Sequence, residues 1–214
     1  MLFRSRNFTA GKPNIEGFLE DYAHLIAAYI ALFGATSDPK WIMDAQQLMD
    51  YTIANFLDDQ AGFFRFNAMT DQPFLAPQFE IEDNVIPAAN SVMGHNLWKL
   101  SLVFEHENHH AIALKMLSNI VPKIDYAGGY SNRLLLYLNL DSSQKEIAIV
   151  GQNARREALD LFAQYVPNCI IFSSETVLDL PFFSNRFVPN KTLFYICQNK
   201  TCGLPLDHIA LLKL

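Results

Sequence analysis

The stretch Ile15–Phe33, IEGFLEDYAHLIAAYIALF, decides the fold class of this chain. Its apolar side chains recur every three or four residues, which is the period of an amphipathic α-helix. Residues Pro39–Phe56 have the same period, with Ser37 or Asp38 as the N-cap and a proline in the first turn. Because only a few residues separate the two stretches, we expect an antiparallel helical hairpin.

The rest of the chain divides into a helical part and a mixed part. Further helices are expected at 87–104, 109–121 and 130–139, and then the hydrophobic period changes. Strands are expected at 145–150, 168–173 and 193–197, with helices at 155–165 and 207–214. The sequence therefore predicts a mainly α protein. Helical hairpins occupy residues 1–140, and a small α/β C-terminal element, 141–214, packs on them as one compact domain.

Composition excludes several classes of partner. The 214 residues are 50% hydrophobic and 18% charged, with a net charge of −6. No run of Lys and Arg is present, so neither nucleic acid nor a membrane surface is expected as a partner. The longest apolar run, Leu25–Phe33, is too short to span a bilayer. The first residues lack a signal-peptide core, and the three cysteines fit a reducing compartment, so a cytoplasmic location is expected. The low charge suggests covered apolar surface, as in a homo-oligomer.

Acidic side chains cluster at the start of the first predicted helix. Glu20 and Asp21 are four and three residues before His24, which lets them share a helical face. We predict Asp21 as a catalytic acid or base facing a cavity, with Glu20 and Tyr22 as substrate contacts. The alternative is that these carboxylates only complement the dipole of the helix.

A second polar cluster marks the start of the helix expected at 87–104. Asp83 precedes it, and Asn90, Ser91 and His95 follow, with Trp98 on the same face as His95. We predict Asp83 and His95 as catalytic residues, and Asn90, Ser91 and Trp98 as contacts for a sugar-like small molecule. A Ser91–His95 nucleophile and base is a weaker interpretation, since no nucleophile elbow surrounds the serine. The alternative is helix capping and a core histidine.

Three other groups of residues carry side chains that could bind a ligand or a metal. Phe64 and Arg65 are predicted substrate contacts, because a guanidinium amid aromatic side chains can bind a sugar acid; the alternative is core packing. The histidines of residues 106–110 are expected in a solvated loop, not at a metal. Cys197 and Cys202 are predicted to lie close together, either free, as a reversible disulfide or as half of a zinc site completed by Cys169 and His208. No metal and no cofactor is expected.

Four segments, in order, resemble one known family. They are FLEDYA at 18–23, AGFF at 61–64, DNVIPAANS at 83–91 and CQNKTCGLP at 197–205. They are similar to the thioredoxin-domain-containing proteins related to spermatogenesis-associated protein 20. The resemblance covers nearly the whole chain. The sequence departs from the family pattern at Ala61, where the family has glycine, and at Ala88–Ala89, where the family has Ser-Gly.

The resemblance implies an incomplete (α/α)6 barrel, similar to six-hairpin glycosidases and N-acylglucosamine 2-epimerases. The chain corresponds to the C-terminal part of the family, so the family's thioredoxin-like domain and its redox activity do not carry over. The expected function is carbohydrate binding or sugar processing, although this link rests on fold analogy. The alternative is a non-catalytic interaction module that associates through uncovered helix faces or packs against a missing N-terminal region. A thiol-linked regulatory element at Cys197 and Cys202 is the third hypothesis.

Overall fold

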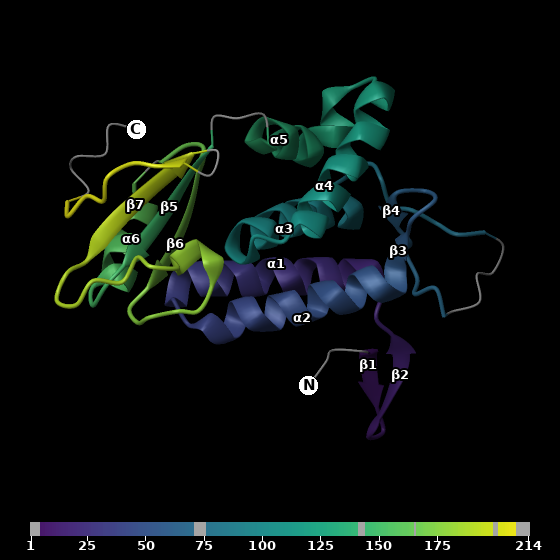
Figure 1. Ribbon diagram of the computed structural model, residues 1–214. Coiled ribbons are helices and arrows are strands. Elements are labelled where there is room, and N and C mark those ends of the chain that lie inside the picture. Colours follow the sequence, from purple (N-terminus) through teal and green to yellow (C-terminus); the bar gives the residue numbers. More distant parts are fainter. Residues whose placement is uncertain (1–4, 71–75, 141–143, 165, 199–200, 209–214) are drawn as a thin grey trace.

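The computed structural model describes residues 5–70, 76–140, 144–164, 166–198 and 201–208. Two antiparallel helical pairs, α1–α2 and α3–α4, form its body, with α5 against α3 and a mixed sheet at one end (Figure 1). The helices are α1 (Leu19–Thr36), α2 (Pro39–Phe56), α3 (Ala89–Phe104), α4 (Glu107–Ile120), α5 (Ser131–Leu140) and α6 (Ala154–Phe162). This confirms a mainly α fold with a small α/β element, and closure into a barrel stays a prediction.

Local sequence explains the first hairpin. Helix α1 ends at Ser37, which adopts a left-handed conformation at φ 58° and donates its N–H to the Phe33 carbonyl. The Asp38 side chain then accepts from the Lys40 N–H, and Pro39 opens α2. Two residues thus reverse the chain, and α2 spans the predicted residues. Helix α1 begins later than predicted, because residues Lys12–Glu16 form β2, which pairs antiparallel with β1 (Ser5–Thr9).

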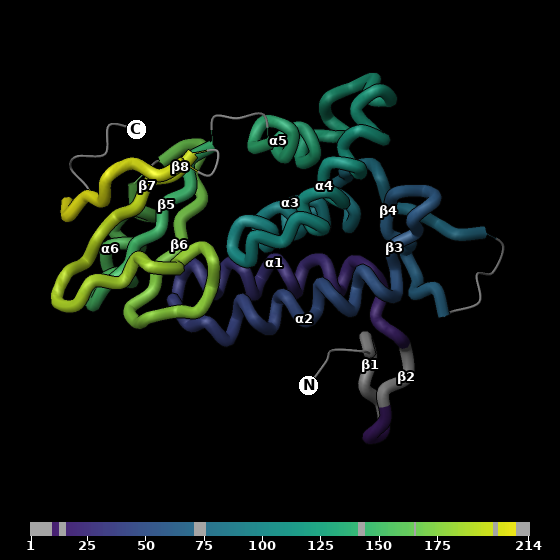
Figure 2. Tube along the Cα trace, viewed as in Figure 1, coloured from purple at the N-terminus to yellow at the C-terminus, as the bar shows by residue number. Residues whose placement is uncertain are grey.

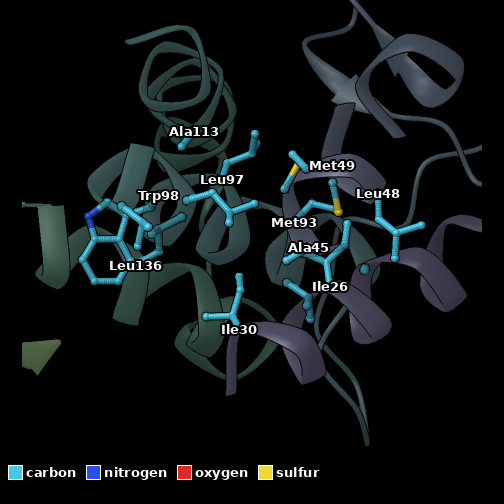
Figure 3. Close-up of a cluster of buried hydrophobic side chains, with 14 of the residues drawn as sticks. Ile26, Ile30, Ala45, Leu48, Met49, Met93, Leu97, Trp98, Ala113 and Leu136 are labelled. Carbon is cyan, nitrogen blue, oxygen red and sulfur yellow. The ribbon is translucent and has the colours of Figure 1, made fainter. Parts of the chain in front are cut away.

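The helical core lies between the two pairs. Ile26 and Ile30 of α1 meet Met93 and Leu97 of α3 and the apolar face of α2, as Figure 3 shows. One polar contact crosses this interface, where the buried Asn96 amide donates to the Ala23 carbonyl over 2.8 Å. This bond fixes the register of α3 on α1, because leaving either buried group unpaired costs free energy.

A four-stranded sheet completes the fold. Its strand order is β6 (Cys169–Ser174), β5 (Lys145–Val150), β7 (Leu193–Gln198) and β8 (Thr201–Cys202). Strands β5 and β6 lie at the predicted positions; they are parallel and joined by α6, while β7 runs antiparallel to β5. The tube in Figure 2 follows this crossover. A smaller antiparallel pair, β3 (Leu57–Asp58) and β4 (Phe63–Phe64), closes the loop after α2.

Both faces of the sheet are buried, which explains the continuous apolar run of β5. Ile147 and Ile149 face a small cluster under α6, whereas Ala148 and Val150 belong to the main helical core. Alternate side chains of a strand point to opposite faces, so one strand serves both cores. The α/β element therefore shares a core with the helices.

Short 3-10 turns complete the connections. They are η1 (Val121–Lys123), η2 (Ala127–Tyr130) and η3 (Pro181–Phe183). Among the described helices, none is long and apolar enough to cross a bilayer. Most of the expected helix at 207–214 lies outside the described residues.

Candidate functional site

A groove of about 1010 Å³ runs between the helices α1, α3 and α5 on one side and α6 and β6 of the α/β element on the other. We call it the interlayer groove. Its walls are largely apolar and come from α1, α3, α5, α6 and β6, with side chains that include Ala27, Ala31, Leu135, Leu159, Phe162 and Phe172. Leu135, Leu159 and Phe162 are each at least 44% exposed, so the groove is open along this rim. Its size and apolar lining are typical of a small-molecule site.

The polar lining of the interlayer groove is basic or neutral. It carries His24, His95 and Lys99, together with amide side chains such as Asn132 and Asn139. Among the described residues that line the groove, none is Asp or Glu. In a protein with a net charge of −6, this distribution favours an anionic or polyhydroxylated ligand over a cationic one.

Lys99 is the most unusual of these groups. It is half-buried on α3, and burial lowers the pKa of its ammonium. Within the described part of the chain its ammonium makes no hydrogen bond and no ion pair. A cation that is partly desolvated without a partner is costly to hold, so such a group at the wall of a groove is a candidate ligand contact.

His95 lies one helical turn before Lys99 and is held by the start of α5. Its Nε2 donates to the Asn132 carbonyl over 2.7 Å, which assigns the neutral tautomer with the proton on Nε2. Burial lowers the pKa of His95, and Lys99 lowers it further, although the hydrogen bond to Asn132 opposes this effect. The imidazole is therefore neutral at physiological pH, with Nδ1 as an acceptor.

Asp83 connects the starts of α3 and α5. Its Oδ1 accepts from the Ser91 hydroxyl over 2.6 Å and from the Ala88 N–H over 2.9 Å, and its Oδ2 accepts from the Asn132 N–H over 2.9 Å. These bonds hold the residue whose carbonyl positions His95. Asp83 does not itself line the interlayer groove. The Ser91 hydroxyl can donate to Asp83 or to the Ala88 carbonyl, and within the described part of the chain it makes no hydrogen bond to His95.

Other predicted contacts lie in the core. Asn90 is fully buried, and its side-chain amide both accepts from the Phe64 N–H and donates to the Phe64 carbonyl, each over 2.8 Å. Phe64 is also fully buried. Trp98 is 4% exposed and borders the groove with its ring 6.4 Å from that of His95. Of these three, only Trp98 reaches the groove.

The acidic cluster at the start of α1 lies apart from the groove lining. Asp21 Oδ2 accepts from the Phe18 N–H over 2.9 Å and so caps the first turn of α1. Tyr22 is 1% exposed and packs on the rings of Tyr51 and Phe56. Neither Glu20, Asp21 nor Tyr22 lines the interlayer groove, and their catalytic or binding roles stay predictions.

Arg65 is engaged by a neighbouring carboxylate. Its Nε and Nη2 contact Asp58 Oδ2 over 2.9 and 2.5 Å. The pKa of Asp58 is lowered by the Ala61 N–H and by Arg65. A substrate carboxylate at Arg65 would have to compete with this ion pair.

The sequence reasoning did not identify Lys99, Asn132 or Arg133. Lys99 does carry a signal, because it is the one Lys, Arg, Asp or Glu in the sequence of α3, ANSVMGHNLWKLSLVF. Arg133 is buried; its Nε donates to the Ile81 carbonyl, and its guanidinium lies 5.6 Å from the Phe63 ring centroid. Burial lowers the pKa of Arg133 to about 10, with Asp83 opposing. No sequence pattern marks Asn132.

The histidine run at 106–110 differs from its predicted solvated loop. It opens α4, which begins at Glu107, and His109 is 1% exposed. The apolar period of α4 extends back over this turn, so the helix buries His109, the second histidine of the run. Among the described residues, no group of three or more His, Cys, Asp or Glu side chains is arranged to hold a metal.

Cys197 and Cys202 form a disulfide across β7 and β8. Their sulfurs are bonded to each other, so of the predicted alternatives the structure shows the disulfide. Cys169 is a free, partly buried thiol on the interlayer groove, away from this pair.

In a comparison with known proteins, the chain is similar to spermatogenesis-associated protein 20 from three mammals. It is 28% identical over 218 residues to spermatogenesis-associated protein 20 of rat and 26% identical over 216 residues to the human protein. Each match covers 94% of this chain. The predicted family resemblance is confirmed. The chain spans only 27 to 28% of the length of these relatives, and no family model matches it.

Proposed function

We propose that the protein binds a sugar-like small molecule that carries a carboxylate or phosphate, with the interlayer groove as its site. The observation that supports this most directly is Lys99, a half-buried ammonium without a partner among the described residues, on a wall that lacks acidic side chains. An anionic group beside Lys99 would supply the missing counter-charge, and an ion pair in a partly desolvated site is stronger than one in water.

The remaining lining suits the rest of such a ligand. Asn132 and Asn139 carry amides that can bind hydroxyl groups, and the apolar walls can cover the C–H face of a sugar ring. His95 has an acceptor nitrogen, Nδ1, that could remove a proton from a bound sugar. Glycoside hydrolysis generally requires two carboxylates, which the groove lining lacks. Within sugar processing, we therefore propose isomerisation or simple binding over hydrolysis.

A ligand panel tests this function. Neutral sugars, sugar acids and sugar phosphates are titrated into the protein by calorimetry, and binding is expected for the acids or phosphates only. Lys99→Met is expected to weaken binding by at least about tenfold, as for the loss of one charge-assisted contact. The matched control is Lys123→Met, an exposed lysine outside the groove. Equal affinity in both variants, or no binding by any member of the panel, would refute the proposal.

The second candidate is an interaction module without chemistry. Leu135, Leu159 and Phe162 leave exposed apolar surface along one rim of the groove, which is the surface that a partner helix would cover. Phe162→Glu should then abolish self-association measured by light scattering. A wild-type protein that is strictly monomeric at all concentrations would argue against a homo-oligomer.

A further inference from the structure

A second cavity, of about 570 Å³, is lined by the disulfide, which plays no part in the interlayer groove. It lies between the start of α4 and the β7–β8 edge of the sheet, and both Cys197 and Cys202 line it together with Arg186. We call it the disulfide cavity. The exposed Cys202 gives solvent access to the bond, while Cys197 is 2% exposed.

Arg186 is placed directly against the sulfurs. Its Nη2 lies 3.4 Å from the Sγ of Cys197 and 3.4 Å from the Sγ of Cys202. The guanidinium lies over the rings of Phe182 and Tyr195, at 5.6 and 5.5 Å from their centroids, which fixes its orientation. Its buried Nη1 has no hydrogen-bond partner among the described residues. A cation aimed at two neutral sulfurs gains more when one of them becomes a thiolate.

The disulfide closes only a short loop. Cys197 and Cys202 are only five positions apart and directly opposite each other in strands that are already paired. The entropy that a disulfide removes from the unfolded chain grows with the length of the loop it closes, so this short closure contributes less than most.

We propose that Cys197 and Cys202 form a thiol–disulfide exchange site in which Arg186 stabilises the thiolate that leaves. An incoming thiolate from a low-molecular-weight thiol forms a bond to Cys202 Sγ, and the bond between the two protein sulfurs breaks. Its electron pair stays on Cys197 Sγ, beside Arg186. A second thiolate then attacks the sulfur of the attached thiol, releases a small-molecule disulfide and leaves Cys202 as a thiolate that takes up a proton. Two small thiols are oxidised and one protein disulfide is reduced.

This proposal does not depend on the function proposed for the interlayer groove. The full chain is equilibrated in native buffer with glutathione mixtures of varied redox ratio, then alkylated, and each cysteine is quantified by peptide mass spectrometry. Cys197 and Cys202 should become labelled together while the fold, followed by circular dichroism, is retained. A Cys197→Ser variant should accumulate glutathione on Cys202. Cys169 is the internal control, because burial raises the pKa of its thiol.

The role of Arg186 is measured on the same exchange. Arg186→Met should slow reduction by at least about tenfold and raise the pH at which Cys197 is alkylated, while Arg186→Lys should restore part of the rate. The proposal is overturned if the wild-type disulfide is reduced only when the protein unfolds, or if a folded Arg186→Met protein exchanges at the wild-type rate. The wild-type measurement decides the exchange chemistry even where a variant fails to fold.

Discussion

His109 should make the stability of this protein depend steeply on pH. Its side chain is 1% exposed on α4, its Nδ1 has no hydrogen-bond partner among the described residues, and the ring of His106 stacks on it at 4.0 Å. Burial, and then the charge of His106, lower the pKa of His109 from 6.5 to about 4. Asp50 lies 3.8 Å from its Nε2 and would favour the charged form. Asp50 is 61% exposed, however, so water screens this attraction and burial dominates.

The sign and size of the effect follow from these values. Above about pH 6.5 His109 is neutral in both the folded and unfolded states and contributes no pH dependence. Between 6.5 and about 4 the unfolded chain binds a proton that the folded protein excludes, so the free energy of unfolding falls as the pH falls. At about 1.36 kcal/mol for each pKa unit, the loss amounts to about 3 kcal/mol.

The measurement is urea unfolding of wild type and His109→Leu between about pH 7.5 and about pH 4. Titrating carboxylates change the unfolding free energy of both proteins alike, so the difference between the two free energies reports the contribution of His109. The unfolding free energy of wild type minus that of His109→Leu should decrease by about 3 kcal/mol as the pH falls across this range. His110→Ala, at an exposed neighbour in the same helix, serves as the control and should follow the wild-type profile. A constant difference between wild type and His109→Leu would show that His109 is not held neutral by burial.

Other substitutions test the contacts that build the fold around the groove. Asn90→Ala leaves the buried N–H and C=O of Phe64 unpaired, so urea unfolding should show a loss of about 2 to 4 kcal/mol. Asp83→Asn replaces an acceptor of three hydrogen bonds; a loss of about 2 kcal/mol is expected, and an unchanged unfolding free energy would contradict the role given to this carboxylate. Gly151→Ala places a Cβ against the backbone of Lys191 and Thr192 at φ +137°, and its thermal midpoint should fall by more than about 5 °C, whereas Gly203→Ala, with only an ordinary contact to the Ile196 carbonyl at 3.9 Å, should change it little.

The positions of the helices and strands could be predicted well from sequence. The range of α2 and of β5 agrees with their hydrophobic periods, and the strand–helix–strand unit follows from short connections between apolar runs. The start of α1 was wrong by four residues, because Lys12–Glu16 has a partner strand that no local pattern reveals. The prediction of a solvated loop was wrong at His109 for a related reason, since the burial of this residue depends on the packing of α4 against α3 and on its contact with Asp50 of α2.

The sequence by itself determined the periodicity, the capping residues and the segments shared with relatives, because these depend on residues close together in the chain. Only the tertiary structure decided which polar groups line a cavity. Asp21 and Asp83 stand at helix starts, as the sequence predicts, yet their oxygens are directed to backbone N–H groups. Lys99 and His95 line the groove instead. The physical reason is that the N–H groups at a helix start lack intrahelical acceptors and so bind nearby carboxylates, in the same turn for Asp21 and at the start of a second helix for Asp83. The surroundings of Lys99 come from elements far apart in the sequence.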